Sequence, residues 1–292
     1  MLNKDSVSLE GKVALVTGGG AGIGRAIAQA YGALGARVAV AEISAEKVSA
    51  LREELADAGV DALVSQTDVR DSAQVADFLA EVDKRYARLD ILVNNVGDHL
   101  GMVKTLEQMS EEEWDQVYQI NLRHLFVVTK AALPLMRRSG EGGSIINVSS
   151  IEGFRANPYN VIYTCCKHAV TGFTRTMALE LANDNIRVNT IAPETTDSEQ
   201  VPLEYLLKPG HAGELLGKPA YLTRTLPSNR FGRPDDHAGA AVFLATELSS
   251  WVNGSTVNVD GGGLAAAGFQ RIPSGPWTII PEVTGTAVQG VD

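Results

Sequence analysis

The stretch Lys12-Val-Ala-Leu-Val-Thr-Gly-Gly-Gly-Ala-Gly-Ile-Gly24 decides the fold. Its short apolar run, Val13 to Val16, predicts a buried parallel strand, and the glycines after it predict a tight turn into a helix. An apolar-periodic stretch, Arg25 to Leu34, and a second apolar run over residues 37–41 follow. Together these residues predict a strand–turn–helix–strand unit of an α/β fold.

The glycines of this turn predict an anion-binding site. Gly18, Gly22 and Gly24 let the backbone turn tightly and approach a pyrophosphate, whose charge is favoured by free N–H groups at a helix N-terminus. A glycine-rich turn alone is a weak signal, because loops of similar composition often bind nothing. Glu42 closes the second predicted strand, where a carboxylate suits the ribose hydroxyls of a dinucleotide, and this favours the cofactor interpretation.

A second motif points to proton transfer. Tyr163 and Lys167 are four residues apart, thirteen residues after Ser150, so on a helix the ammonium lies one turn from the phenol. Free tyrosine has a pKa near ~10, and lowering it to about 7 takes roughly 4 kcal/mol. A lysine cation and an oxidised nicotinamide ring would together supply this in a site that excludes water. Because such a pair also occurs on solvated helix faces, the interpretation depends on the other motifs in the chain.

Strands and helices alternate along the chain. Apolar runs predict about seven strands, near residues 13–17, 37–41, 61–66, 89–93, 143–149, 186–191 and 255–259. The predicted helices include 110–138, which starts with a capping-box pattern at Ser110 and which Pro134 should kink or break. Others are predicted at 159–183 and 235–248, the latter announced by Pro234. The alternation predicts a single domain with a Rossmann-type doubly wound parallel sheet, flanked by helices on both faces.

The motifs occur in the order found in the classical short-chain dehydrogenase/reductase family, which the chain resembles over roughly residues 8–263. Besides the glycine turn, Asp68-Val69, Asn94-Asn-Val-Gly97, Asn189-Thr-Ile-Ala-Pro193 and Asn253 to Gly262 resemble segments of that family. The resemblance implies an NAD-binding catalytic domain over residues 1–263 and a homo-oligomer, a tetramer or a dimer. It also implies a nicotinamide-dependent enzyme that interconverts a secondary alcohol and a ketone.

The resemblance also implies roles for individual residues. Tyr163 would be the acid/base, Ser150 would orient the substrate, and Lys167 would grip the nicotinamide ribose. Asn121 would keep a helix locally open for a water that relays protons to Lys167. The cofactor-binding residues it implies are Gly18, Gly22, Ile23, Gly24, Glu42, Asp68, Val69, Asn95, Val96, Gly97, Tyr163, Lys167, Pro193, Thr196 and Ser198.

Glu42 favours NAD over NADP, because its carboxylate can bind both ribose hydroxyls and repels a 2′-phosphate. NADP-preferring members of the family typically carry a basic residue in the glycine turn or after the second strand, where this chain has Ala21 and Ile43. Arg25 is expected to point away. The alternative is that Glu42 is a solvated carboxylate at a strand end.

One departure from the family pattern concerns the sixth strand, where Pro193-Glu194 replaces the usual Pro-Gly. Glutamate tolerates unusual dihedrals and close approach less well than glycine does. Either Glu194 adopts an ordinary conformation with its carboxylate near the substrate, where it would select a polar or cationic group, or the loop has shifted. A harmless surface substitution is the remaining alternative.

Two segments are left to carry specificity. Residues 194–230 mix prolines and glycines with leucines, a composition typical of a substrate lid with an apolar underside. The extension 264–292 carries large apolar residues spaced by prolines, which predicts an ordered arm on a neighbouring subunit; a flexible terminus is the alternative.

Substrate identity is less defined. We expect a hydrophobic or cyclic substrate beside a site with apolar wall, and the candidate substrate contacts are His99, Glu152, Tyr159 and Glu194. Two alternatives stay open: a reductase of 3-oxoacyl groups on a carrier, which predicts NADP preference and a basic docking patch, and a non-catalytic NAD-sensing regulator or scaffold. The presence of Ser150, Tyr163 and Lys167 argues against the regulator.

Composition narrows the function classes. The net charge of −10 and pI near 5.0 argue against nucleic acid or an anionic membrane as partner. Residues 1–10 lack the apolar stretch of a signal peptide, and we expect a cytoplasmic location. Cys165 and Cys166 are neighbours, so a packing role is favoured over a disulfide. The five histidines show no zinc-like spacing, so no metal is expected.

Overall fold

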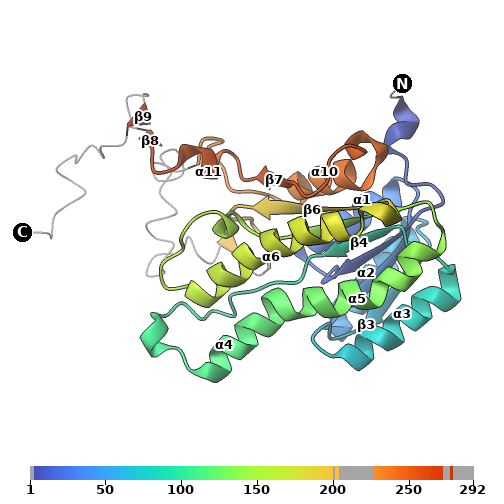
Figure 1. Cartoon of the computed structure of the whole chain (residues 1–292), viewed down its shortest axis with the longest axis horizontal. Helices are drawn as coiled ribbons and strands as arrows, with labels where there is room; N and C mark the ends of the chain where they lie inside the picture. Colours follow the sequence, from blue (N-terminus) through green and yellow to red (C-terminus); the bar gives the residue numbers. More distant parts are fainter. Residues whose placement is uncertain (1–2, 200, 204–225, 272–276, 279–292) are drawn as a thin grey trace, which may run out of the picture.

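The chain was analysed as a computed structural model that describes residues 3–199, 201–203, 226–271 and 277–278. Its centre is a seven-stranded, all-parallel sheet of order β3-β2-β1-β4-β5-β6-β7 (Figure 1). The strands are β1 Val13–Thr17, β2 Arg37–Glu42, β3 Ala62–Gln66, β4 Ile91–Asn94, β5 Gly143–Val148, β6 Ile186–Pro193 and β7 Thr256–Val259. All seven predicted strands are confirmed, and so is the doubly wound sheet.

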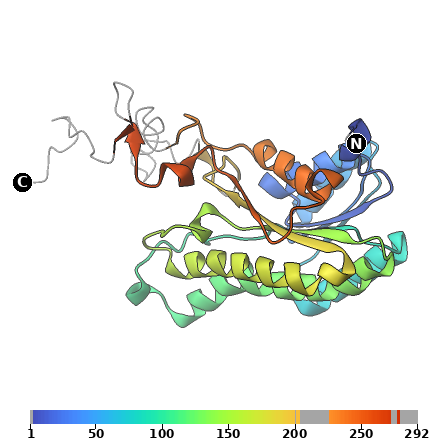
Figure 2. The same cartoon turned by 45° about the horizontal axis from the view of Figure 1, so that its top comes forward.

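Helices cover both faces of the sheet, as Figure 2 shows. The main ones are α1 Gly22–Ala33, α2 Ala45–Asp57, α3 Ser72–Tyr86, α4 Glu111–Tyr118, α5 His124–Arg138, α6 Val161–Glu180 and α10 Pro234–Ala245. A short helix, α11 Gly263–Ala266, follows β7, and two-residue strands β8 Gln270–Arg271 and β9 Trp277–Thr278 pair antiparallel.

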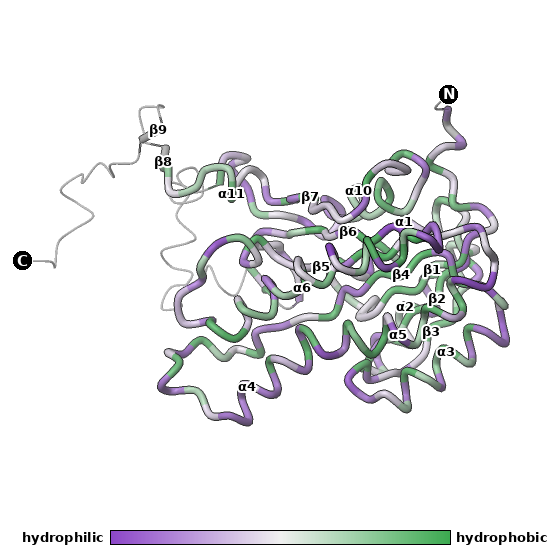
Figure 3. Tube along the Cα trace, viewed as in Figure 1, coloured by the Kyte–Doolittle hydropathy of each residue, from purple (hydrophilic) through white to green (hydrophobic). Residues whose placement is uncertain are grey.

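The alternation of side chains along each strand builds two separate cores. In β1, Ala14 and Val16 face a cluster with α1, α2 and α10, whereas Val13 and Leu15 face a cluster with α3, α5 and α6. Because both faces are covered, the strands at the centre of the sheet, β1 and β4, are almost entirely apolar rather than alternating with polar residues. The tube in Figure 3 accordingly shows hydrophobic colour along the central strands.

The long helix predicted over 110–138 differs from the expectation. A five-residue π-helical segment, Gln119–Arg123, separates α4 from α5. The capping box at Ser110 is confirmed, but Pro134 does not break its helix, which continues to Arg138. A proline removes one helical hydrogen bond, and burial of Leu135 and Met136 just after it compensates for that loss.

Most of the two segments expected to carry specificity lies outside the described residues. This applies to residues 204–225 of the predicted lid and to 272–276 and 279–292 of the extension. The lid and the subunit-contacting arm therefore remain predictions.

Candidate active site

The glycine turn joins β1 to α1 at the carboxyl edge of the sheet. Gly18 and Gly22 have φ of +63° and +52°, a region that favours glycine, and a Cβ on Gly24 would collide with the carbonyl oxygen of Gly18. Asn95 Nδ2 holds the turn by donating to the carbonyl oxygens of Thr17 and Gly18, both at 3.1 Å. The first turn of α1 has no side-chain cap, so its N–H groups can bind an anion.

The carboxylate of Glu42 faces this turn and is not a solvated strand end. Glu42 is only 7% exposed, and its two oxygens accept from the backbone N–H of Gly20 and of Ser44, each at 3.0 Å. Each carboxylate oxygen retains acceptor capacity. Glu42 is thus fixed beside the glycine turn, where a ribose would follow a bound pyrophosphate.

Asp68 and Val69, predicted to bind the cofactor, lie just after β3. Val69 is buried, and the carboxylate of Asp68 binds Arg70, with Oδ2 2.7 Å from Nη2. The hydrogen bond from Arg70 lowers the pKa of Asp68. Sequence reasoning missed Arg70, although a cation two residues after the aspartate was visible.

The residues predicted as a catalytic group do come together. Lys167 Nζ lies 5.3 Å from the centre of the Tyr163 ring and donates to the carbonyl oxygen of Val148 at 3.4 Å. The hydroxyl of Ser150 lies near enough to the Tyr163 phenol to lower its pKa. Ser150 comes two residues after β5, and Tyr163 is in the first turn of α6, so the segment between β5 and α6 brings them together.

Asn121 lies in the π-helical segment. Its Nδ2 donates to the carbonyl oxygens of Val117 and Asp98, at 2.9 and 2.6 Å, and its Oδ1 accepts from Asp98 N–H at 3.1 Å. A Cβ on Gly97 would lie 2.6 Å from Lys167 Nζ and 3.0 Å from Asn121 Oδ1. Asn121 therefore links the opened helix to the β4 loop beside Lys167, as expected for a residue that keeps the helix open.

The proton affinities differ from the simple expectation. Burial raises the pKa of Tyr163 to about 12, a shift that the Ser150 hydrogen bond opposes and the charges of Glu152 and Asp98 increase. Burial lowers the pKa of Lys167 to about 8, so the amine is mainly charged at neutral pH. The lysine does not by itself bring the phenol near neutrality, because desolvation outweighs it.

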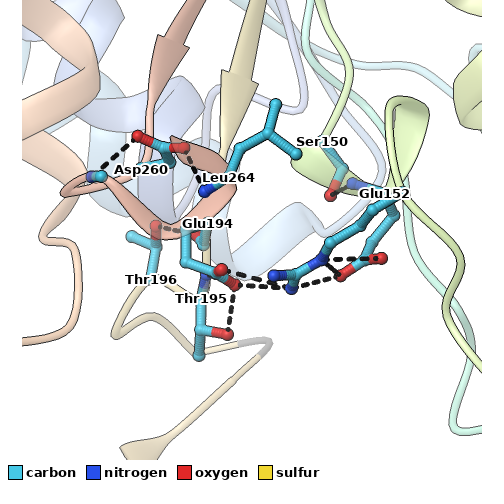
Figure 4. A network of polar contacts seen from close by, with 9 residues as sticks. Ser150, Glu152, Glu194, Thr195, Thr196, Asp260 and Leu264 are labelled. Atoms are coloured by element: carbon cyan, nitrogen blue, oxygen red, sulfur yellow. Dashed lines mark hydrogen bonds and ion pairs between the residues drawn. The ribbon is translucent and has the colours of Figure 1, made fainter. Parts of the chain in front are cut away.

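The segment after β6 answers the question raised by Glu194. This residue has an ordinary backbone conformation, since it is not among those with positive φ, and its side chain is 12% exposed. Its Oε1 accepts from Thr195 N–H at 2.8 Å, and Arg155 joins it to Glu152 (Figure 4). Glu194 is therefore a built part of the site and not a surface substitution.

The other predicted cofactor contacts in this segment, Pro193, Thr196 and Ser198, have different surroundings. Ser198 lies beside Gly22, whose added Cβ would be 3.4 Å from Ser198 Cβ, and Pro193 is buried on β6. Thr196 Oγ1 binds the Glu194 carbonyl at 2.8 Å and His237 Nε2 at 2.7 Å, so this hydroxyl is engaged within the protein. His237, which comes from α10, was missed.

Two predicted substrate contacts occupy different environments. The His99 ring stands edge-on to Tyr163 with centroids 6.4 Å apart, so this loop histidine belongs to the site. Tyr159 has φ of +66° and is 60% exposed. The described residues that contact Tyr163 or act on its charge include the polar side chains of His99, Ser150, Glu152 and Asp98.

The described part of the chain gives little support to thiol or metal chemistry. Cys165 is exposed and Cys166 buried, and both are free. Within the described ranges, no three His, Cys, Asp or Glu side chains form a group able to hold a metal ion. Among the described helices, none is both long and apolar enough to cross a membrane.

Three features define a nucleotide-binding oxidoreductase fold: a parallel sheet with a glycine turn, a carboxylate at the end of the second strand, and a group of Ser, Tyr and Lys side chains. The family model for short chain dehydrogenases matches residues 12–203. The chain belongs to this family of oxidoreductases, which use a nicotinamide cofactor.

Curated relatives and solved structures agree with this assignment. The chain is 38% identical to the 3-oxoacyl-[acyl-carrier-protein] reductase FabG of Thermotoga maritima, over 87% of this chain and 98% of the relative. It is 37% identical to the D-threitol dehydrogenase of Mycolicibacterium smegmatis, over 87% and 93%. A 7α-hydroxysteroid dehydrogenase complexed with NADH and 7-oxo glycochenodeoxycholic acid superposes with a TM-score of 0.82 at 32% identity, over 90% of this chain and 98% of that one.

Proposed function

We propose that the protein is an NAD-dependent oxidoreductase that interconverts a secondary alcohol and a ketone, with Tyr163 as the acid/base. The observation that carries the proposal is the contact group of Ser150, Tyr163 and Lys167, placed at the same sheet edge as the glycine turn. This arrangement is suited to moving one proton while a hydride leaves carbon.

In the oxidation direction, Tyr163 Oη takes the proton of the substrate hydroxyl as the carbinol carbon gives up its hydride. When bound, NAD would supply the hydride acceptor and a positive ring that favours the phenolate. Ser150 holds the substrate oxygen through its hydroxyl. The positive charge of Lys167 stabilises the phenolate of Tyr163. Asn121, which faces Lys167 across the opened helix, would support the exchange of the proton with solvent. Reduction is the same sequence reversed.

The preference for NAD rests on Glu42. Its buried carboxylate beside the glycine turn would accept hydrogen bonds from the two ribose hydroxyls, and it would repel a 2′-phosphate at the same place. The residues proposed to surround the cofactor are those named from the family resemblance, with Ser198 supported by its contact with Gly22.

The decisive experiment mixes the protein with NAD and a panel of secondary alcohols and follows the absorbance of the reduced cofactor. Turnover with NAD, and slower turnover with NADP, is the expected result. Silence across a broad panel with tight NAD binding would instead support a sensor without turnover.

A second candidate is a reductase of 3-oxoacyl groups on a carrier, which the similarity to the Thermotoga maritima reductase favours. It predicts NADP preference and activity on carrier-linked ketones. Glu42 argues against it. The basic residues expected to dock a carrier are Lys208, Lys218, Arg224, Arg230 and Arg233. The first three lie outside the described residues, and Arg230 is paired with Asp236.

We further propose that the enzyme is a homo-oligomer, a dimer or a tetramer, located in the cytoplasm and without nucleic acid or membrane partners. Residues 1–263 would form the catalytic domain, with 194–230 as the substrate lid and 264–292 as an arm reaching a neighbouring subunit. Limited proteolysis that removed 264–292 without loss of assembly or activity would contradict the proposed arm.

A further inference from the structure

Three charged side chains lie together beside Ser150. Arg155 Nη2 is 2.8 Å from Glu152 Oε1 and 3.2 Å from Glu194 Oε2. We call Glu152, Arg155 and Glu194 the acidic triad. The two carboxylates come from different loops, one following β5 and the other following β6, and Figure 4 shows them converging on the guanidinium between them.

The triad is built into the structure and is not a chance surface pair. The side chains of Glu152 and Glu194 are 14% and 12% exposed. Glu194 Oε1 is further fixed by Thr195 N–H and Oγ1, at 2.8 and 3.1 Å. On the other side, Glu194 packs on Gly263, where a Cβ would lie 2.8 Å from its Oε2. Substantially enclosed and positioned carboxylates of this kind are suited to recognition.

The triad lies next to the reacting group. Glu152 N–H donates to Ser150 Oγ at 3.1 Å, and the charge of the Glu152 carboxylate acts on Tyr163. A substrate oxygen held between Ser150 and Tyr163 would therefore lie near Glu152, which Arg155 joins to Glu194.

The triad offers both acceptors and donors. Among the described residues, Arg155 is the polar partner of both Glu152 Oε2 and Glu194 Oε2, although a carboxylate oxygen can accept two hydrogen bonds. Arg155 donates through Nε and Nη2, and its side chain is 40% exposed. A hydroxyl group can donate to such a carboxylate and accept from such a guanidinium at once.

The charge of the acidic triad would also discriminate between substrates. Two carboxylates and one guanidinium leave a net charge of −1, and Asp98 adds another carboxylate that acts on Tyr163. A substrate carboxylate at this place would meet repulsion, and an apolar group would leave partly buried charges without the partners they have in water.

We propose that Glu152 and Glu194 are specificity-determining residues that bind a hydroxyl group on the carbon next to the reacting one. The inference rests on the proposed oxidoreductase function and names its substrate class. The substrate is a neutral polyhydroxylated alcohol or the corresponding hydroxyketone, and a hydroxy acid is rejected.

The test uses the full chain with NAD and four secondary alcohols that differ in one group beside the carbinol: propylene glycol, sec-butanol, lactate and isopropanolamine. We expect kcat/KM for propylene glycol to exceed that for sec-butanol and for lactate by about 10-fold or more, since a site built for a hydroxyl leaves polar groups unpaired with its analogues. In Glu194→Gln and in Glu152→Gln, the ratio of kcat/KM for propylene glycol to kcat/KM for lactate should fall by about 10-fold. The KM for NAD should be unchanged.

The matched control is Glu141→Gln, which removes a carboxylate that also pairs with an arginine, Arg88, but far from the site. Its ratios should equal those of the wild type. Equal use of lactate or sec-butanol by the wild type, or unchanged ratios in both triad variants, overturns the inference. Preference for isopropanolamine overturns it too, because the triad would then act through charge alone. If only other secondary alcohols react, this inference fails and the proposed function stands; if no alcohol reacts, the proposed function itself fails.

Discussion

At the scale of single residues, Tyr163 is held in the protonated form by the protein around it. Burial raises the pKa of its phenol to about 12, and the adjacent carboxylates add to that shift. Lys167 has a pKa of about 8, so its amine is mainly charged at neutral pH. A bound oxidised nicotinamide, whose ring is positive, would lower the proton affinity of the phenol and so tie proton transfer to cofactor binding.

The substitution Tyr163→Phe tests this role. It removes the proton-transfer group and leaves the ring, so we expect kcat to fall by about 10²–10⁴-fold while NAD affinity stays within about 2-fold of wild type. Steady-state kinetics and NAD titration by fluorescence give the two values. Tyr118→Phe, at an exposed tyrosine on α4, is the control. Near-normal turnover by Tyr163→Phe would assign the acid/base to another residue.

The substitution Glu42→Ala tests cofactor choice. We expect the KM for NAD to rise by about 10-fold, because two charge-assisted hydrogen bonds to the ribose are lost, and the discrimination against NADP to relax. Parallel kinetics with both cofactors measure this, and Glu46→Ala, an exposed carboxylate on α2, is the control. Full retention of NAD preference would show that the ribose is bound elsewhere. A thermal melt checks that the loss of the bonds to Gly20 and Ser44 has not unfolded the turn.

At the scale of elements, the π-helical segment and the start of α5 carry a buried histidine. His124 is 1% exposed, and burial, followed by the charge of Lys167, lowers its pKa to about 3. In the unfolded chain the histidine would titrate near ~6.5. Below that pH the unfolded state binds a proton that the folded state refuses, so stability falls as the pH falls towards about 3.

This linkage predicts a loss of about 2 kcal/mol between neutral pH and pH ~5 from His124 alone. Urea unfolding at a series of pH values measures the slope. His124→Gln, which cannot take up a proton, should flatten it, whereas His168→Gln on the exposed face of α6 should not. An unchanged slope in His124→Gln would mean that other groups account for the acid sensitivity.

The elements were largely predictable from sequence, and the reasons are local. A buried parallel strand must be apolar on both faces, so the runs at β1, β2 and β5 stand out from their surroundings, and the glycine turn fixes where α1 starts. The π-helical segment has no such local signal, because Asn121 opens the helix through bonds to Asp98, far along the chain. The end of α5 at Arg138 agrees with the prediction, but the expected break at Pro134 was wrong: the local rule does not take account of the buried Leu135 and Met136 that follow the proline.

The candidate site was predictable where it follows the family motifs and less so where it is made by long-range pairing. Arg155 was not recognised because its partner Glu194 is 39 residues away, and each charge alone reads as a solvated side chain. Thr196 and His237 meet across 41 residues in the same way. The departure at Glu194 was visible in the sequence, but its meaning depended on which loop it would face.

At the scale of the whole molecule, two phenylalanines meet on the outer side of α5 and α6, whose inner sides are packed on the sheet. Phe126 on α5 is 40% exposed, and it contacts Phe173 on α6 with ring centroids 5.4 Å apart. Large apolar side chains exposed together on a face are typical of surfaces that associate. This face is therefore our candidate for contact between copies of the chain.

Phe126→Asp places a charge in the middle of this face and should shift the protein towards a smaller species, because a buried unpaired carboxylate opposes association. Size-exclusion chromatography with light scattering, over a range of protein concentrations, gives the mass directly. Ile43→Asp is the matched control, since Ile43 is also exposed, at 53%, but lies just after β2. If Phe126→Asp keeps the wild-type mass at every concentration, α5 does not form the interface; if the wild type is itself monomeric, the proposed homo-oligomer is wrong.

Activity measured across the same dilution series shows whether the site works within one copy of the chain. If Phe126→Asp is monomeric and still turns over normally, the site needs no arm from a neighbouring subunit.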